Sequence, residues 1–356
     1  MGKKIICLTG LGDYRKGVIN KIIKAPVAID IIAGTQAFEK SIKLLDANDF
    51  DQINFVENTF ILNRKLMIQK GSFLKCLSAD KLIIDLNPRV INVWLVIILR
   101  LMLGKKTCTW GHAWPRSNKK GILRWLLKKL SHKVIVYTET QRQEILKIDS
   151  TINVVAAPNA LYDKEDILNN IKFLNNDPKN IIHVGRIVAS KKVNLIIEAF
   201  ALIKDKLPKG SKLILVGDGD DLNKLKNRTF ELNLQDSIIF TGHVIDPIKL
   251  REYYTSSLFS ISAGYVGLSI TQSFSFGVPM LISTNEPHSP EIEAAVEGKN
   301  SVFFTTDSID DLSAKILEFY KDKNYWLNSR SKIIENCAEN YSTDKMAQRI
   351  LSCFED

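Results

Sequence analysis

The fold of this chain is most constrained by the way short apolar segments, rich in β-branched residues, alternate with longer segments of helical periodicity. The short segments begin roughly 20–30 residues apart, the length of one strand plus one helix. Helical periodicity is clearest at Val193, Ile196, Ile197, Phe200 and Ile203, which keep the i, i+3, i+4 spacing. The expected strands are 4–9, 28–33, 53–56, 81–85, 106–110 and 133–137 in the first half, and 181–184, 212–216, 238–241, 258–262, 278–283 and 301–304 in the second. Two successive βαβ arrays predict an α/β chain with two doubly wound parallel sheets.

Chain length and local composition predict the domain boundaries. With 356 residues, the chain has room for about two domains that each bury a core. Ala157-Pro158-Asn159 is a turn signal, and the segment 164–179 is polar. We therefore expect a Rossmann-like domain at 1–165, a second at 166–325, and a helical segment at 326–356 that ends without a strand.

The cysteines and the apolar runs indicate a reduced, cytoplasmic protein. Five cysteines, an odd number without a CxxC pair, argue against a disulfide framework and against a zinc site. No acidic metal-binding pair stands out, so no metal is expected. The run Ile5–Gly10 is too short for the core of a signal peptide. The run Val90–Leu103 is too short to span a bilayer and contains Asn92 and Arg100, which predicts a buried helix.

Positive charge is concentrated in the first half of the chain. Residues 1–150 carry a net charge of +14 and residues 151–356 carry −4, which together give the total of +10. Between Leu86 and Thr138 there are eleven Lys and Arg and no Asp or Glu. Such a field attracts phosphates, nucleic acid or anionic lipid headgroups.

A basic, amphipathic segment lies within this acid-free stretch. Its apolar residues at 122, 123, 126, 127 and 130 share one helical face. The flanking residues expected to contact a membrane or an acceptor are Lys120, Arg124, Trp125, Lys128 and Lys129. This is the pattern of an interfacial helix, and it is equally the pattern of a surface helix whose leucines enter the core.

Two candidate site features lie in the first half. The loop Gly10-Leu11-Gly12-Asp13-Tyr14-Arg15 follows the first strand, where free backbone N–H groups can bind an anion. Arg15 replaces the third glycine of a dinucleotide fingerprint, so a structural turn and a ligand loop both remain open. His112 ends a strand, the position where open α/β sheets bind ligands, and it is a candidate general acid or base as well as a structural residue.

The second half contains a pair of cations and a glycine-flanked loop. Gly185 and Arg186 follow a strand, and Lys191 lies five residues further on, so both cations can converge on one diphosphate or form a solvated surface pair. Further along, 262–268 is a short loop that opens a helix, where N–H groups suit a phosphate or a sugar hydroxyl.

Five motifs in order resemble the donor domain of the retaining glycosyltransferases of family 4, which have the GT-B fold. The motifs are GRxxxxK, LxxVGDG, FTG, GYVGLSITQSFSFGVPM and PEI, within about residues 180–305. The resemblance extends loosely to capsule and O-antigen enzymes. It implies two Rossmann-like domains facing a cleft, the first binding the acceptor and the second the donor, with the C-terminal helix crossing back to the first.

The resemblance also implies roles for individual residues. Arg186 and Lys191 would hold the donor diphosphate, and His112 would face the transferred sugar. The implied donor-binding residues are Gly12, Gly185, Gly217, Gly242, His243, Gly264, Tyr265, Val266, Gly267, Leu268 and Gln272.

The sequence departs from the family pattern at two positions. The family usually has two glutamates separated by seven residues, and these fall on Gly264 and Gln272. The first usually contacts the donor sugar and has no side chain here. The second accepts hydrogen bonds from ribose hydroxyls, which glutamine can also do.

The resulting prediction is a metal-independent glycosyltransferase that uses a nucleotide-sugar, with UDP favoured over GDP. The acceptor would be a polysaccharide or lipid-linked oligosaccharide, the anomeric configuration would be retained, and the role would be cell-surface polysaccharide biosynthesis. The location would be cytoplasmic, peripheral on the inner face of the cell membrane. Two alternatives are a nucleotide-sugar epimerase of GT-B fold and a basic nucleic-acid-binding protein, although the basic stretch has no nucleic-acid motif. A Rossmann dehydrogenase ranks third.

Overall fold

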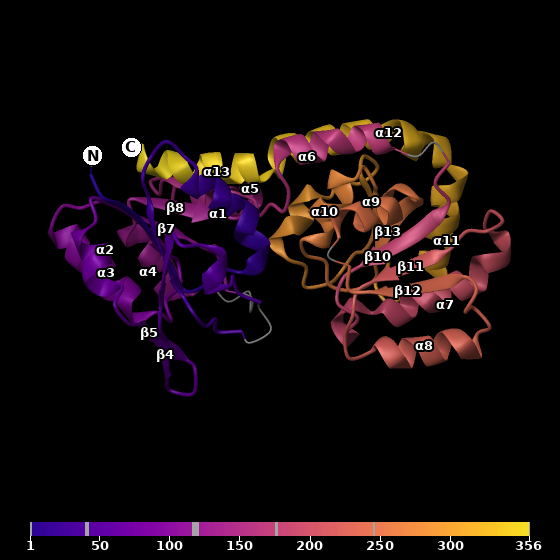
Figure 1. Cartoon of the computed structure of the whole chain (residues 1–356), viewed down its shortest axis with the longest axis horizontal. Helices are drawn as coiled ribbons and strands as arrows, with labels where there is room; N and C mark the ends of the chain where they lie inside the picture. The colour runs from indigo at the N-terminus through magenta and orange to yellow at the C-terminus, as the bar shows by residue number, and fades with distance from the viewer. Residues whose placement is uncertain (1, 40–42, 116–120, 175–176, 245, 356) are drawn as a thin grey trace. The chain divides into compact units, whose positions relative to one another are not determined.

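The chain forms two compact units in the computed structural model, which describes residues 2–39, 43–115, 121–174, 177–244 and 246–355. One unit comprises Met1–Leu161 with Thr343–Asp356, and the other comprises Tyr162–Ser342 (Figure 1). The boundary expected after residue 165 therefore falls after Leu161. The C-terminal segment returns to the first unit at Thr343, not at 326.

The first unit contains a seven-stranded sheet, a two-stranded hairpin and the helices that cover them. Its strands are β1 (Lys4–Leu8), β2 (Asp30–Gly34), β3 (Ile53–Val56), β4 (Asn58–Ile61), β5 (Leu66–Gln69), β6 (Lys81–Asp85), β7 (Thr107–Trp110), β8 (Lys133–Val136) and β9 (Val154–Ala156). Its α-helices are α1 (Lys16–Ile23), α2 (Phe73–Ser78), α3 (Ile91–Met102), α4 (Ile122–Leu130), α5 (Glu139–Ile148) and α13 (Thr343–Leu351).

Alternation along the strands places a separate core on each face of this sheet. The order is β3-β2-β1-β6-β7-β8-β9, with every pair parallel. On one face, Ile6 and Leu8 of β1 pack with residues of α1 and α13. On the other, Ile5 and Cys7 pack with residues of α2, α3, α4 and α5. Strands buried on both faces require continuous apolar runs, which is why the sequence pattern located them.

The second unit is a second parallel sheet between helices. Its strands are β10 (Asn180–Val184), β11 (Leu213–Val216), β12 (Ile238–Gly242), β13 (Ser257–Ser262), β14 (Met280–Ser283) and β15 (Ser301–Phe304). Its α-helices are α6 (Lys164–Asn169), α7 (Val193–Ile203), α8 (Leu222–Glu231), α9 (Pro247–Thr255), α10 (Ser269–Ser275), α11 (Ile309–Lys321) and α12 (Lys323–Asn340).

The strand order of the second sheet is β12-β11-β10-β13-β14-β15. Helices α7, α8 and α11 cover one face, and α6, α9, α10 and α12 cover the other. Local capping fixes some helix starts: the Ser308 hydroxyl accepts the N–H of Asp311 at the start of α11. Helix α12 is held in this unit by buried Arg330, whose Nε donates to the carbonyl of Gly277 at 3.1 Å.

Each sheet has a topological switch point, where the first strand lies between strands that the chain adds in opposite directions. In the first sheet this point lies between β1 and β6, and in the second it lies between β10 and β13. Ligands of open α/β sheets bind outside the carboxyl ends of the strands at such points. The loops after β1, β6, β10 and β13 are therefore the expected ligand-binding loops.

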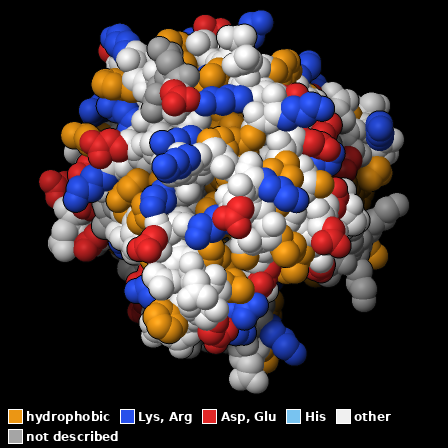
Figure 2. Space-filling model, turned by 90° about the vertical axis from the view of Figure 1, so that its right-hand side faces the viewer, with side chains coloured by type: hydrophobic (Ala, Val, Ile, Leu, Met, Phe, Trp, Pro, Cys, Tyr) orange, Lys and Arg blue, Asp and Glu red, His pale blue; other side chains and the backbone are white. Residues whose placement is uncertain are grey.

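The twelve expected strands are all present, and three further strands were not expected. They are β9 at the sheet edge and the hairpin β4–β5, whose turn places Leu62, Asn63 and Arg64 at positive φ. Within the described part of the chain, no helix combines the length and apolar character needed to cross a membrane. Figure 2, seen from the side of α8 and α11, shows Lys and Arg interspersed with Asp, Glu and apolar side chains.

Candidate functional site

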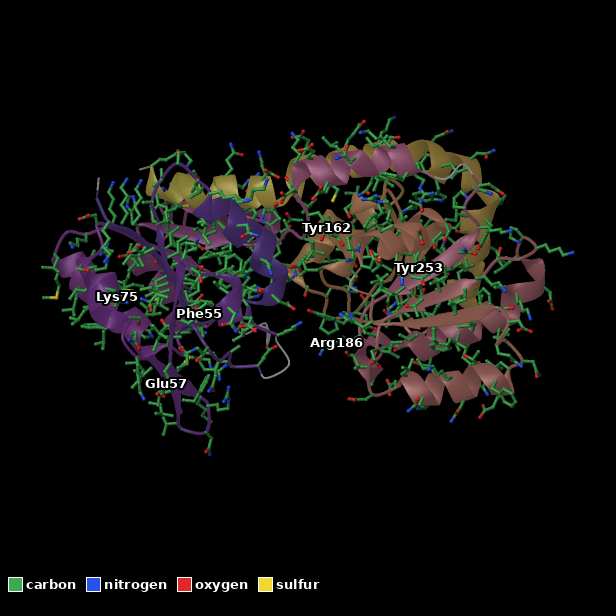
Figure 3. The ribbon with its side chains drawn as sticks, viewed as in Figure 1. Phe55, Glu57, Lys75, Tyr162, Arg186 and Tyr253 are labelled. Carbon is green, nitrogen blue, oxygen red and sulfur yellow. The ribbon has the colours of Figure 1, made fainter. Side chains whose placement is uncertain are left out.

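The switch point of the second sheet brings together the two cations and the glycine loop. Gly185 and Arg186 follow β10, and the loop 263–268 follows β13, the strand beside it. The Arg186 side chain is exposed on the loop after β10 (Figure 3). An exposed guanidinium at this position is available to a ligand at the strand ends.

Lys191 is the buried partner of this pair. Its Nζ donates to the carbonyl of Tyr265 at 2.5 Å and lies 4.5 Å from the centre of the Tyr265 ring. Burial, and then the charge of Arg186, lower the pKa of Lys191 to about 8. Lys191 is thus a cation fixed against the glycine loop, and its surroundings make it lose its proton more easily than a free lysine does.

Gly264 permits the close approach of the two loops. A Cβ at this position would lie 2.3 Å from the backbone oxygen of Ser190 and 2.9 Å from the backbone carbon of Lys191. The Tyr265 N–H donates to the same Ser190 oxygen at 3.0 Å. Gly264 stands where the resembling family usually has a glutamate, and this backbone leaves no space for a side chain there.

His288 and Ser289 hold the outer side of the glycine loop, and sequence reasoning missed both. The Val266 N–H donates to His288 Nδ1 at 3.1 Å, and His288 Nε2 donates to the carbonyl of Ser283 at 2.9 Å. Burial lowers the pKa of His288, which favours this neutral ring. The Tyr265 hydroxyl is hydrogen-bonded to Ser289. The available signal was a histidine shortly after the strand β14, the feature that singled out His112.

Gln272 lies between two tyrosines. Its Nε2 donates to the Tyr162 hydroxyl at 2.8 Å, and its Oε1 accepts from the Tyr254 hydroxyl at 3.3 Å. The two contacts orient the amide. The tyrosines are 110 and 18 residues away along the chain, so no local pattern could have indicated them.

Gly217 and Gly242 lie at the ends of β11 and β12. The Gly217 N–H donates to the carbonyl of Gly242 at 2.9 Å. Gly217 has φ 144°, and a Cβ there would lie 1.8 Å from the oxygen of Gly185, so only glycine fits. His243 is exposed beside Gly242. The structure thus places these predicted donor-binding residues next to Gly185 and around the same strand ends.

The first unit has its own cluster at the carboxyl ends of β1, β6, β7 and β8. The N–H of Thr9 is hydrogen-bonded to the half-buried carboxylate of Asp85, whose pKa is raised by desolvation. Arg15 is 8% exposed, lies 4.6 Å from the Trp110 ring centre and donates from Nη2 to the Tyr137 hydroxyl at 2.6 Å. Arg15, which replaces the third glycine, is therefore a packed residue of this edge.

His112 and Gly12 lie at the same edge of the first sheet. The His112 ring is 4.6 Å from the Tyr137 ring, and its backbone oxygen accepts from Arg124 Nη1 at 2.8 Å. Gly12 is buried with φ −63°, so its conformation does not itself require glycine. A Cβ on Gly12 would meet the Tyr14 ring at 2.4 Å.

The structure limits which flanking residues of α4 are free to contact a membrane or an acceptor. Lys128 is fully buried and donates to the carbonyl of Ala113 at 3.1 Å, with its Nζ 3.6 Å from the Trp114 ring centre. Burial lowers the pKa of Lys128 to about 8. Trp125 stacks on Trp114, Arg124 donates to the Trp114 carbonyl at 2.9 Å, and Lys129 pairs with Asp149 at 2.6 Å. Lys120 lies outside the described residues.

No group of three or more His, Cys, Asp or Glu that could hold a metal ion occurs among the described residues. All five cysteines are buried and free.

Comparison with known proteins finds one family model and several related proteins that match parts of the chain. The family model for glycosyl transferases group 1 matches residues 164–340. The chain is 25% identical over 229 residues to the poly(ribitol-phosphate) alpha-N-acetylglucosaminyltransferase of Staphylococcus aureus, covering 62% of this chain and 43% of that protein. It is 35% identical over 113 residues to the alpha-monoglucosyldiacylglycerol synthase of Streptococcus pneumoniae, covering 30% and 24%. The aligned segments span less than half the length of either relative.

Solved structures match over nearly the whole chain. The glycosyltransferase from Rickettsia africae has a TM-score of 0.70 at 17% identity, covering 100% of this chain and 98% of that one. The lipopolysaccharide outer core galactosyltransferase WaaB has a TM-score of 0.67 at 16% identity, and HepE from Anabaena in complex with UDP has 0.67 at 14%, each covering 99% of both chains. These likenesses confirm the predicted fold class. Residues 164–340 thus match the group 1 glycosyltransferases, in a chain that has the GT-B fold.

Proposed function

We propose that this chain is a glycosyltransferase that moves a sugar from a nucleotide-sugar, UDP in preference to GDP, to a glycan acceptor. The observation that carries the proposal is the pair of cations beside the glycine loop at the β10–β13 switch point. The match to group 1 glycosyltransferases supports it. So do the UDP complex of HepE and the named activities of the two curated relatives.

The two cations would stabilise the charge that develops on the leaving diphosphate. Arg186 supplies a planar fork of donors and Lys191 a point charge. A bound diphosphate favours the protonated form of Lys191, so its lowered pKa does not prevent this role. The proposal needs no metal, and undiminished turnover in the presence of a chelator is the test of that point.

The glycine loop and Gln272 would hold the rest of the donor. The N–H groups of Tyr265 and Val266 already bond to Ser190 and His288, so donor contacts fall to the N–H groups of Gly267 and Leu268. Gln272 is oriented by its tyrosines and keeps a second lone pair on Oε1 for a ribose hydroxyl. Gly217, Gly242 and His243 would lie beside the nucleotide.

We place the acceptor in the first unit, at the edge that carries His112 and Gly12. His112 would face the transferred sugar. We further propose a polysaccharide or lipid-linked oligosaccharide acceptor, retention of configuration, and a role in synthesis of cell-surface polysaccharide such as capsule or O-antigen. The site of action would be the cytoplasmic face of the membrane.

A thermal-shift panel of nucleotides and nucleotide-sugars tests the donor proposal. A ligand at 100 times its dissociation constant stabilises the folded protein by about 2.7 kcal/mol. We expect UDP and a UDP-sugar to shift the melting temperature, and a panel without any shift would refute the proposal.

A turnover assay then separates the enzyme classes. Nucleotide release that depends on an acceptor supports transfer. The anomeric configuration of the product linkage, determined by NMR, shows whether the configuration is retained. Conversion of the donor sugar without any acceptor identifies an epimerase. Retention of DNA or RNA that is lost at high salt, without nucleotide-sugar binding, identifies a nucleic-acid binder.

A further inference from the structure

Helix α3 buries its polar residues, together with Val93, Val96 and Ile97, and exposes further apolar residues on its other side. Asn92 and Arg100 are its only amide or charged side chains, and both are buried. On the opposite side, Leu95, Ile98 and Met102 follow the i, i+3, i+7 spacing and are 50%, 44% and 78% exposed. The prediction of a buried helix is therefore wrong for this face. A water-facing helix has the reverse arrangement.

The buried polar groups explain why α3 is fixed in this orientation. Asn92 exchanges two hydrogen bonds with the backbone of Gln69, at 2.8 and 3.0 Å. The Arg100 guanidinium donates to the carbonyls of Ala79 and Lys106 at 2.5 and 2.7 Å, and its Nε donates to Thr107 at 2.8 Å. Rotating the helix to hide its outer leucines would leave these groups unpaired, so the apolar face stays outside.

Neighbouring helices extend this face. Helices α2, α3 and α4 pack on the same side of the first sheet (Figure 1). Of the 19 large apolar side chains exposed among the described residues, nine lie on or next to these three helices. We call them the apolar helical face: Leu74, Leu95, Ile98, Leu101, Met102, Leu103, Ile122, Leu123 and Leu126. Soluble monomers rarely expose apolar patches of this kind unless something binds there.

The charges around the face select its partner. The sequence from Leu86 to Thr138 has no acidic residue, and the exposed Lys75 and Lys106 lie on α2 and next to α3 (Figure 3 labels Lys75). Cations beside exposed leucines suit anionic headgroups above acyl chains. A symmetric dimer through this face would instead bring two predominantly basic surfaces together, which like-charge repulsion opposes.

We propose that the apolar helical face inserts into an anionic lipid bilayer, with Lys75 and Lys106 at the headgroups. The contact thus uses the apolar residues of α3 and α4 and not the basic residues of α4, of which Lys128 is buried and Arg124 and Lys129 are engaged with the protein. This inference names the residues that would hold the protein at the membrane, where the proposed function places it. It rests on the proposed function only for the reason that the protein would bind a membrane. Binding to lipid is read without any sugar transfer.

Vesicle flotation of the full chain tests this surface. The vesicles are phosphatidylcholine alone, or phosphatidylcholine and phosphatidylglycerol in equal parts. The test variant is Leu95→Gln/Ile98→Gln/Met102→Gln, which changes only exposed side chains. The matched control is Leu202→Gln/Phe230→Gln/Ile248→Gln, three equally apolar positions of the second unit that are 60%, 70% and 62% exposed.

We expect the wild type and the control to float with the anionic vesicles and the test variant to lose at least about tenfold in vesicle binding. Lys75→Glu/Lys106→Glu should weaken binding to anionic vesicles and leave binding to neutral ones unchanged, because it removes the attraction to headgroups.

Absence of wild-type flotation at low salt, or equal flotation of the test variant, would overturn the proposal. So would a wild-type dimer that the test variant converts to a monomer, since a second copy then covers the face. Nucleotide-sugar turnover should be the same in the test variant and the wild type, so loss of lipid binding and loss of transfer are distinguishable.

Discussion

Replacing Gly264 by alanine tests how the donor loop is built. The added Cβ would lie 2.3 Å from the backbone oxygen of Ser190 and 3.0 Å from the Cα of Lys191. Both are backbone atoms, so the strain cannot be relieved by turning a flexible side chain. The loop must move away, which breaks the bond from the Tyr265 N–H to Ser190 and the bond from Lys191 Nζ to the Tyr265 carbonyl.

The size of the effect follows from these two bonds. A neutral hydrogen bond contributes about 1 kcal/mol and one to a charged group about 1.5–3 kcal/mol, so we expect a loss of about 2.5–4 kcal/mol in unfolding free energy. Displacing the Lys191 cation by about 1 Å should lower turnover roughly 10²-fold. Urea unfolding and nucleotide release are the two measurements.

Gly267→Ala is the matched control in the same loop. Its Cβ would meet only Ser289 Oγ at 3.5 Å and a Tyr265 ring carbon at 3.8 Å, which are ordinary contacts. It should unfold like the wild type. Gly264→Glu, which restores the family's usual residue, should behave like Gly264→Ala and recover no activity. An unfolding midpoint and a turnover number for Gly264→Ala equal to those of Gly267→Ala would refute the reasoning.

Three further predictions concern the donor site. Arg186→Ala and Lys191→Ala should each lower turnover by about 10²-fold or more, because each removes a charge-assisted contact to the leaving diphosphate; near-normal rates in a folded variant would exclude that role. In the wild type, kcat/KM should fall as pH rises through about 8, because Lys191, with its pKa lowered to about 8, loses its charge there; Lys191→Arg should move this decline to higher pH. Gln272→Ala should weaken nucleotide binding by about 1–2 kcal/mol in calorimetry, and Gln272→Glu should bind normally, since a carboxylate accepts from both Tyr162 and Tyr254; the opposite order would show that Gln272 does not hold the ribose.

The sequence by itself determined the two sheets and the order of the site motifs. Strands such as β1 and β10 are buried on both faces, so their apolar runs stand out in the linear sequence. Arg186, Lys191 and Gly264 were singled out because glycines and cations follow those runs. The strands that escaped prediction, β4, β5 and β9, are short or partly exposed, and their pairing depends on partners elsewhere in the chain.

Only the tertiary structure decided which side chains face water. A helical pattern assumes that polar residues point outward, and in α3 long-range hydrogen bonds from Asn92 and Arg100 reverse that orientation. Lys128 is likewise buried because its ammonium donates to the carbonyl of Ala113 and makes cation–π contacts with two tryptophan rings. The space at Gly264 is set by Ser190, which lies more than seventy residues earlier in the chain. Local sequence specifies strands, helices and turns because these depend on near neighbours, whereas burial, close approach and surface character depend on residues that only folding brings together.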